Sequence, residues 1–327
     1  MPANLTPEFI KARNRFREAK EPAGKLAALE EMLSTIPKHK GTDKMQADIK
    51  RRIARLKESE SQAKRGGKAI GYDHVPREGA GQVALIGPPN TGKSSLVAAL
   101  TNARPEVAEY PFSTLVPIPG MMTYKDIRIQ LVDLPPITPE YTEAWVYSVI
   151  RACDMGLVVL DAGDGELLVE ESQGLLRLLE ERSVRLVVQR RAPADERIVD
   201  LPARIVLNKS ETAPGEALGA VVSRLPLPSV AVSATSGRGL ESLRQAVFEA
   251  LEIVRVYTKM PGKKPDLREP YTLPRGSTVL DGVRTVHREF AERLKYVRIW
   301  GSGRFDGQQV PSDHVLEDGD VMEVHLK

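Results

Sequence analysis

The stretch from residue 82 to residue 100, QVALIGPPNTGKSSLVAAL, constrains the fold of this chain more than any other segment. It opens with a short apolar run between Gly81 and Gly87, which predicts a buried parallel strand. The run breaks into GPPNTGKS, a full match to the P-loop pattern, and the following residues continue as a helix. Strand, loop and helix therefore come in the order that phosphate binding requires.

The P-loop predicts how a chain of phosphates is held. Backbone N–H groups of the loop and the positive end of the helix cradle phosphate oxygens. We expect Lys93 to reach the β- and γ-phosphates and the Ser94 hydroxyl to ligate Mg²⁺. The predicted nucleotide-binding residues of this stretch are Gly87, Asn90, Thr91, Gly92, Lys93, Ser94 and Ser95. A glycine-rich turn that matches by chance is the alternative, and the flanking strand and helix weigh against it.

Length and composition limit the classes of protein to consider. At 327 residues, with 41% hydrophobic and 28% charged residues, the chain fits two or three globular domains. No apolar run approaches the roughly 20 residues that span a membrane, and the first residues lack the apolar core of a secretory signal. The single cysteine, Cys153, fits a reducing compartment. We therefore expect a cytoplasmic protein with no membrane partner.

Charge is unevenly distributed along the chain. Residues 1–68, predicted to be a basic helical segment, hold 17 Lys and Arg against 9 Asp and Glu. Four of these basic residues, Lys50, Arg51, Arg52 and Arg55, share one predicted helix. Such an excess favours an acidic partner, with RNA the first candidate. A solvated helical face explains the charge equally well, so both interpretations stay open.

Two further domains follow from the pattern of apolar runs. Residues 69–254 alternate strand and helix signals, which predicts an α/β domain with a doubly wound, mostly parallel sheet. Within it, RLVVQR at 185–190 is one strand signal too many, and we assign it to an extra hairpin before residue 203. Residues 255–327 place several strand signals around one predicted helix at 278–293, which is typical of a small β-grasp domain.

Three more motifs stand at the ends of apolar runs in the α/β domain. Asp133 is placed where a carboxylate holds Mg²⁺ through water in P-loop proteins. Asn208, Lys209 and Glu211 resemble the Asn-Lys-x-Asp motif that reads guanine, and Ser233, Ala234 and Thr235 follow the last strand, where a backbone N–H meets the base. Each motif is weak alone, but their order along the chain argues against chance.

These motifs resemble the Obg–HflX superfamily of GTPases, and most closely the developmentally regulated GTP-binding protein (DRG) family. YPFSTL at 110–115 resembles the superfamily's switch I, and RVYTK at 255–259 begins a stretch similar to a TGS domain, a β-grasp module. The resemblance implies a GTPase that hydrolyses GTP to GDP with Mg²⁺ and acts on ribosomes or RNA in translation or ribosome assembly. It implies Lys93 and Thr114 as catalytic residues and Ser94, Thr114 and Asp133 as Mg²⁺ ligands.

The sequence also departs from the family pattern. Pro136 stands where the family has a glycine whose N–H contacts the γ-phosphate, and proline has no N–H to donate. Glu211 replaces the guanine-reading aspartate. Residue 137, where many small GTPases carry a water-orienting glutamine, is isoleucine; the superfamily commonly has a hydrophobic residue there, and the resemblance therefore implies slow or differently assisted hydrolysis. The interval from Asp133 to Asn208 leaves little room for the extra domain usual in the family.

These departures leave alternatives open. We expect slow intrinsic hydrolysis, and we keep two rivals: an RNA-associated nucleotide-binding module with little hydrolysis, and an ATPase on the same scaffold. Asn90 matches a position linked to K⁺ activation in related GTPases, although ordinary turn chemistry explains an asparagine there equally well. The sequence leaves open whether an accessory protein takes part.

Overall fold

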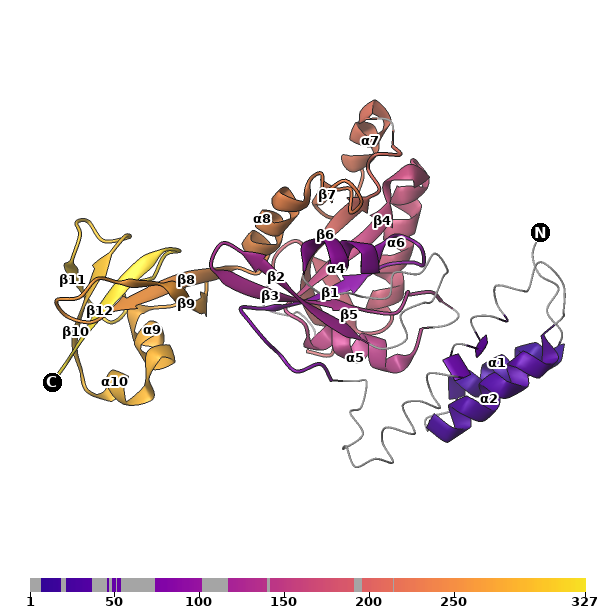
Figure 1. The fold of residues 1–327 in the computed structure, drawn as a ribbon, viewed down its shortest axis with the longest axis horizontal. Coiled ribbons are helices and arrows are strands. Elements are labelled where there is room, and N and C mark those ends of the chain that lie inside the picture. Colours follow the sequence, from indigo (N-terminus) through magenta and orange to yellow (C-terminus); the bar gives the residue numbers. More distant parts are fainter. Residues whose placement is uncertain are drawn as a thin grey trace.

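The structure of this protein is a computed structural model, and it describes most of the chain. The described residues are 7–18, 22–36, 46, 49–50, 52–53, 74–101, 117–139, 142–190, 196–213 and 215–327. They form a pair of N-terminal helices, a central α/β domain and a C-terminal domain rich in strands (Figure 1).

The central domain is built on a seven-stranded sheet with the order β2-β3-β1-β4-β6-β5, and β7 pairs with β6. Its strands are β1 (Gln82–Ile86), β2 (Ile118–Tyr124), β3 (Ile127–Asp133), β4 (Met155–Asp161), β5 (Val184–Val187), β6 (Val199–Asn208) and β7 (Ser229–Ala231). Among the described strands of this sheet, β2 and β3 alone pair antiparallel, and the other strand pairs are parallel. The predicted mostly parallel sheet is therefore confirmed.

Helices cover both faces of this sheet (Figure 1). They are α4 (Lys93–Leu100), α5 (Ala144–Ala152), α6 (Leu167–Glu180), α7 (Gly215–Val222) and α8 (Leu240–Ala250), with a 3₁₀ turn at Ala162–Asp164. Successive side chains of a strand point to opposite faces. Accordingly Ala84 and Ile86 of β1 pack in one core cluster with α5 and α6, whereas Val83 and Leu85 pack in the other with α4 and α8. This arrangement confirms the doubly wound fold.

The extra hairpin assigned to residues 185–190 is wrong. That segment contains the parallel edge strand β5, in which Val184 lies opposite Val199 and Leu186 lies opposite Leu201 of β6. The connection from 188 to 198 is far longer than a hairpin loop and long enough for a parallel crossover. Because β6 extends past β4, its first residues offer a hydrogen-bonding edge that β5 occupies.

The C-terminal domain is a five-stranded sheet with the order β11-β10-β12-β8-β9 and two short helices. Its elements are β8 (Ile253–Lys259), β9 (Asp266–Pro274), α9 (Val279–Val286), α10 (Arg288–Glu292), β10 (Leu294–Trp300), β11 (Gln308–Val310) and β12 (Asp320–Leu326). The single helix expected at 278–293 is divided, because His287 adopts an extended backbone with a φ of −163°. Thr278 and Asp281 form a capping box that fixes the start of α9.

The N-terminal helices α1 (Pro7–Glu18) and α2 (Pro22–Thr35) pack against each other. Phe9, Phe16 and Leu29 are buried between them, and Arg15 pairs with Glu31 at 2.7 Å. Residues 46, 49–50 and 52–53 are helical, and Ile49 joins the same apolar cluster. Arg51 and Arg55 of the predicted basic helix lie outside the described residues. No helix in the described part of the chain combines the length and apolar character needed to cross a membrane.

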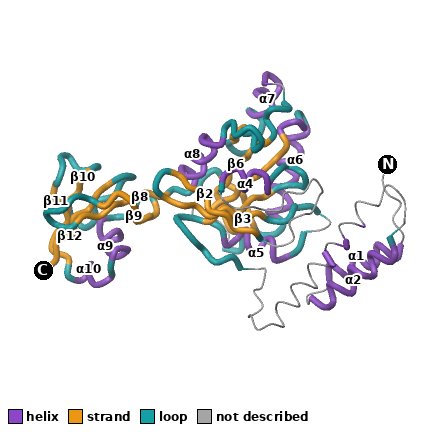
Figure 2. The backbone as a smooth tube through the Cα atoms, viewed as in Figure 1, coloured by secondary structure: helices purple, strands orange, loops and turns teal. Residues whose placement is uncertain are grey.

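A buried arginine joins the C-terminal domain to the central one. Arg255 of β8 contacts Asp318 through Nε and Nη2 at 2.9 and 2.7 Å, and its Nη1 reaches Asp126 at 2.7 Å. Asp126 lies in the turn between β2 and β3, toward which β8 and β9 extend (Figure 2). Tyr257 also donates its hydroxyl proton to Asp126. Asp126, Arg255, Tyr257 and Asp318 therefore form one polar cluster, which we call the junction cluster.

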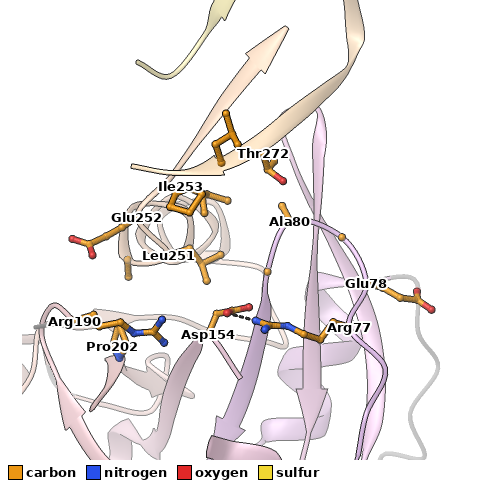
Figure 3. Close-up of a pocket in the computed structure, with 15 residues that line it drawn as sticks. Arg77, Glu78, Ala80, Asp154, Arg190, Pro202, Leu251, Glu252, Ile253 and Thr272 are labelled. Atoms are coloured by element: carbon orange, nitrogen blue, oxygen red, sulfur yellow. Dashed lines mark hydrogen bonds and ion pairs between the residues drawn. The ribbon is translucent and has the colours of Figure 1, made fainter. Parts of the chain in front are cut away.

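A cleft of about 340 Å³ opens beside this joint (Figure 3). Arg77, which precedes β1, pairs with Asp154 in its wall, and Asp154 also accepts a hydrogen bond from the backbone N–H of Gln82 at 2.9 Å. Leu251 and Thr272 line it from the two domains. The ion pair and the hydrogen bond therefore attach the segment that leads into β1 to Asp154, beside the joint between the two domains.

The junction cluster should make stability depend on pH. Burial opposes ionisation of Asp126, but the Tyr257 hydroxyl and the Arg255 guanidinium outweigh it and lower the pKa of this carboxyl. Burial likewise opposes ionisation of Asp318, and the hydrogen bonds of Arg255 lower its pKa. The stabilisation is thus fully present above the unfolded-state pKa values and is lost as pH falls through the folded-state values. We expect the unfolding midpoint of Asp126→Asn to fall less steeply with decreasing pH than that of wild type. An equal slope of midpoint against pH in the two proteins would contradict this expectation.

Candidate nucleotide-binding site

The predicted motifs lie at one edge of the central sheet, where the carboxyl ends of β1, β3, β4 and β6 meet. The P-loop joins β1 to α4, and two of its glycines are sterically required. A Cβ on Gly87 would lie 2.3 Å from the Val159 carbonyl oxygen, and one on Gly92 would lie 2.4 Å from the Asn208 amide nitrogen. Asn90 has a φ of 65°, a conformation that asparagine tolerates in turns.

Lys93 lies inside the P-loop. Its ammonium donates to the carbonyl oxygens of Gly87 at 3.0 Å and Pro88 at 2.7 Å, and only 6% of the residue is exposed. Burial lowers the pKa of Lys93 to about 8, against the opposing effect of the Asp133 carboxylate. The P-loop thus positions Lys93. Its N–H donors can exchange their hydrogen bonds to loop carbonyl oxygens for hydrogen bonds to phosphate oxygens.

Ser94 and Asp133 meet although 39 positions separate them. The Ser94 hydroxyl donates to Asp133 Oδ2 at 2.5 Å, and the aspartate is fully buried at the end of β3. Mg²⁺ prefers oxygen ligands and takes only one or two carboxylates from a protein, with water and phosphate oxygens completing its shell. The residues present therefore fit Mg²⁺. Thr114, the other predicted ligand, lies outside the described residues.

Asn208 connects the P-loop with the loop after β7. Its Nδ2 donates to the Thr91 carbonyl at 2.9 Å, and its Oδ1 accepts from the backbone N–H of Ala234 at 3.1 Å. Lys209 makes a parallel link, because its ammonium contacts the Asn90 carbonyl at 2.7 Å. Segments predicted to hold the phosphates and to read the base are thus joined directly.

Two residues of this region were missed by the sequence analysis. Asp161 ends β4 and pairs with Lys209 at 2.6 Å. Arg238 donates to the carbonyl and hydroxyl oxygens of Ser210 at 2.9 and 3.0 Å. Asp161 follows a buried apolar run, as Asp133 does, and this position was the available signal. Arg238 carries no comparable signal, because no pattern in the sequence around it indicates a contact with Ser210, which stands inside the Asn-Lys-x-Asp-like motif.

Glu211 is exposed and close to the loop after β7. The Ser233 hydroxyl hydrogen-bonds to its carboxylate, and this contact is the largest cause of a lowered pKa for Glu211. Thr235 is exposed in the same loop, and Ser95 is half-buried in the first turn of α4. Glu211 and Ser233 therefore lie together where the Asn-Lys-x-Asp resemblance places the base.

The segment after Asp133 is packed against the P-loop. Pro136 is buried, and the backbone N–H of the next residue, Ile137, donates to the Gly87 carbonyl at 3.0 Å. The Ile137 side chain is 3% exposed and packs in the core with Leu134 and Val146. Ile137 is consequently a core residue in this structure and does not point at the phosphate site.

Comparisons with known proteins agree with this geometry. Residues 82–191 match the family described as 50S ribosome-binding GTPase, and residues 254–326 match the TGS domain. An uncharacterized GTP-binding protein of Halobacterium salinarum is 30% identical, over 91% of this chain and 97% of its own length. The developmentally-regulated GTP-binding protein 2 homolog of Dictyostelium discoideum is also 30% identical, over 93% of this chain and 99% of its own.

The chain belongs to the developmentally regulated GTP-binding protein family. A further relative, ribosome-interacting GTPase 1 of Saccharomyces cerevisiae, is 27% identical over 93% of this chain and 98% of its own. Membership in the DRG family confirms the resemblance read from the motifs, including the C-terminal TGS domain. The protein is a GTPase, and GTP and GDP are the nucleotides of its central domain.

Compared with the Dictyostelium protein, this DRG family member lacks residues within the aligned region. The alignment with the Dictyostelium protein runs over 361 positions, more than the 327 residues of this chain, so gaps fall opposite residues of the relative. These gaps agree with the short interval between Asp133 and Asn208. In the structure this interval is filled by elements of the central sheet and its helices, from α5 to β6.

Proposed function

We propose that this protein hydrolyses GTP to GDP and phosphate with Mg²⁺ and acts on ribosomes or RNA in translation or ribosome assembly. The observation that carries the proposal is the convergence of three features on one edge of the sheet. These are Lys93 within its loop, the contact between Ser94 and Asp133, and the links that Asn208 and Lys209 make to the P-loop.

Phosphoryl transfer by such a site relies on positioning and electrostatics. Lys93 and the loop N–H groups would neutralise charge that develops on the phosphate oxygens. Ser94, Asp133 and Thr114 would hold Mg²⁺, which when bound supplies charge neutralisation at the same oxygens. Asn90 as a ligand for K⁺ stays a hypothesis, since its backbone conformation alone accounts for the residue.

Base recognition is assigned to the other half of the site. Asn208 and Glu211 would pair with the base edge while Lys209 packs over the ring, and a backbone N–H of the Ser233–Thr235 loop would meet the base oxygen. The contact between Ser233 and Glu211 supports this assignment, because it holds the longer glutamate side chain beside that loop. In this role Glu211 supplies the carboxylate that aspartate supplies in the Asn-Lys-x-Asp motif.

We predict that GTP and GDP bind at least about tenfold more tightly than ATP, a difference of about 1.4 kcal/mol or more. The reason is that a site with hydrogen-bonding groups for one base leaves them unpaired with another. Calorimetric titration of the purified protein with each nucleotide measures the ratio. Equal affinities would favour the ATPase instead.

The matched variants are Asn208→Ala and Glu211→Ala. Asn208→Ala should weaken all nucleotides, because the same amide positions the Thr91 carbonyl of the P-loop. Glu211→Ala should lower the affinity for GTP, which reduces the difference in affinity between GTP and ATP, and should leave ATP affinity unchanged. A loss of ATP affinity in the second variant would contradict the assignment.

The ribosome or RNA as partner, and a cytoplasmic location, rest on the relatives and on charge. One relative is named for ribosome interaction, and the matched family is described as ribosome-binding. The basic excess of residues 1–68 supplies positive charge for phosphate contacts. Phosphate release followed with and without ribosomes tests whether the partner changes hydrolysis.

We predict salt-sensitive co-sedimentation with ribosomes that depends on Lys50, Arg51, Arg52 and Arg55. Changing all four to glutamine should lower the slope of log affinity against log salt by about 3, because each phosphate contact releases counterions. Sedimentation across a salt series measures the slope. Identical slopes for variant and wild type would indicate that these basic residues form a solvated helical face and do not contact phosphates.

A second candidate function is nucleotide binding with little hydrolysis. Pro136 favours it, because its position lacks the N–H that contacts a γ-phosphate in the family pattern, and the neighbouring Ile137 N–H is directed to Gly87. Single-turnover phosphate release with saturating GTP separates the two candidates. Release no faster than in buffer, with tight GTP binding, would select the second.

A further inference from the structure

The sheet of the C-terminal domain has one face covered by helices and an opposite face without helices, which is open except where Arg255 and Tyr257 of β8 meet the central domain at Asp126. Val297 and Ile299 of β10 are buried with Val279 and Val283 of α9, so these alternate positions face the helices. Tyr296, Arg298 and Trp300 occupy the intervening positions and project to the other side. Residues 253–327 are all described, and both of their helices lie on the first side.

We call this open side the outer face, and its residues form a continuous patch across three strands. The patch consists of Tyr296, Arg298 and Trp300 of β10, Glu323 and His325 of β12, and Lys259 of β8. Arg298 lies opposite Glu323, which lies opposite Lys259, and Tyr296 lies opposite His325. The register therefore sets aromatic rings and cations side by side.

The rings of the outer face are held in fixed orientations. Tyr296 and His325 stack with ring centroids 4.3 Å apart and planes 19° from parallel. Lys259 Nζ lies 3.9 Å from the centroid of the Trp300 ring. All four residues are half-buried, so each retains exposed surface. His325 and Lys259 each lie over one face of these rings, so a flat ligand would stack on the ring surface that they leave exposed and would meet rings that are already ordered.

The charge of the outer face is positive toward solvent. Its one carboxylate, Glu323, is 4% exposed and contacts Lys259 at 3.0 Å and His325 at 2.7 Å. That negative charge is consequently buried and paired, whereas Arg298 is an exposed residue whose guanidinium lies 5.9 Å from the centroid of the Tyr296 ring. Cations interleaved with half-exposed rings match a chain that carries both phosphates and flat bases.

We propose that the outer face binds single-stranded RNA, with bases stacked on Tyr296 and Trp300 and a phosphate at Arg298. The choice of RNA rests on the proposed function. Unpaired bases are required, because the faces of paired bases are hidden within a duplex and only single strands offer them to aromatic side chains. The sheet presents this surface without any change in the fold, and its residues come from the TGS domain alone.

Binding of a fluorescent 12-nucleotide RNA of mixed sequence to the full chain, followed by anisotropy, tests the proposal. The single strand should bind at least about tenfold more tightly than the same sequence in a duplex. Tyr296→Leu and Trp300→Leu, which keep apolar bulk but remove the ring, should each weaken binding about tenfold. Arg298→Glu should weaken it by at least as much and reduce the salt slope by about 1.

Arg288→Glu is the matched control, because Arg288 is likewise an exposed arginine but lies on α10, on the helical side of the domain. It should bind the single strand as wild type does. An equal loss for Arg288→Glu and Arg298→Glu, duplex binding as tight as single-strand binding, or wild-type affinity in both ring variants would overturn the proposal. Failure to bind RNA together with binding of an acidic peptide would overturn it in favour of a protein partner.

Two measurements keep this test separate from the proposed function. GDP affinity and the unfolding midpoint of each variant show whether the fold is retained; if Trp300→Leu unfolds the domain, Tyr296→Leu and Arg298→Glu decide. Ribosome co-sedimentation of the same proteins gives the other comparison. Variants that sediment with ribosomes as wild type does but fail to bind the RNA would support the outer face as an RNA-binding surface. A wild-type protein that binds the RNA but does not sediment with ribosomes would count only against the ribosome as partner.

Discussion

Replacing Arg255 with alanine should lower the free energy of unfolding of the C-terminal domain by about 3–5 kcal/mol, the usual cost of removing one partner from a buried ion pair. Arg255 is 9% exposed, and its guanidinium contacts both Asp126 and Asp318. The contact with Asp318 is the largest cause of a raised pKa for Arg255. Alanine would leave two partly buried carboxylates without their cation.

The two tryptophans allow this effect to be measured by domain. Trp145 belongs to the central domain and Trp300 to the C-terminal one. In a Trp145→Phe background, fluorescence during urea unfolding reports on the C-terminal domain. Arg268→Ala, an exposed arginine on β9, is the control and should change the free energy of unfolding by less than about 0.5 kcal/mol. Equal midpoints for the two variants would contradict the role of Arg255.

Replacing Pro136 with glycine should increase the response of residues 134–148 to the γ-phosphate. A ligand shifts a conformational equilibrium only by its differential contacts with the two states. Glycine restores one charge-assisted hydrogen bond, worth about 1.5–3 kcal/mol. We therefore expect wild type to show similar protease sensitivity of 134–148 with GDP and with a non-hydrolysable GTP analogue, and Pro136→Gly to show protection only with the analogue.

The neighbouring proline supplies a matched control. Pro135→Gly adds the same backbone freedom one position earlier, without placing an N–H at residue 136, and should leave the two nucleotide states alike. Cleavage at residues 110–115, around Thr114, should respond to nucleotide in every variant. Strong nucleotide-dependent protection of 134–148 in wild type would show that another group, such as the Ile137 N–H, makes the contact.

The fold was predictable where local pattern and tertiary structure agree. Val83 to Ile86 is apolar at every position because both faces of β1 are covered, and this pattern predicted the parallel sheet. The pairing of β5 was not predictable, because a short apolar run does not indicate which strand lies beside it. The break at His287 was missed for a related reason: the helical pattern continues through it, and the extended backbone there is not encoded by glycine or proline.

The site was predictable in its residues more than in its connections. Lys93, Ser94 and Asn208 stand in motifs whose spacing reflects their chemistry, so sequence alone named them. Their contacts with one another depend on the order of strands in the sheet. The position of Asp161 after an apolar run was a sequence signal, but its contact with Lys209 became visible only when β4 was placed between β1 and β6.

The separation of apolar clusters bears on how such a chain can evolve. The central and C-terminal domains each enclose their own core, and the joint at Arg255 is polar. A module of this kind can be gained or lost by recombination, because its removal uncovers charged groups that water solvates together with limited apolar contacts, such as that of Ile253 with the central-domain core. The same arrangement lets selection retune the orientation of the two modules through single charge changes, while each core keeps its sequence.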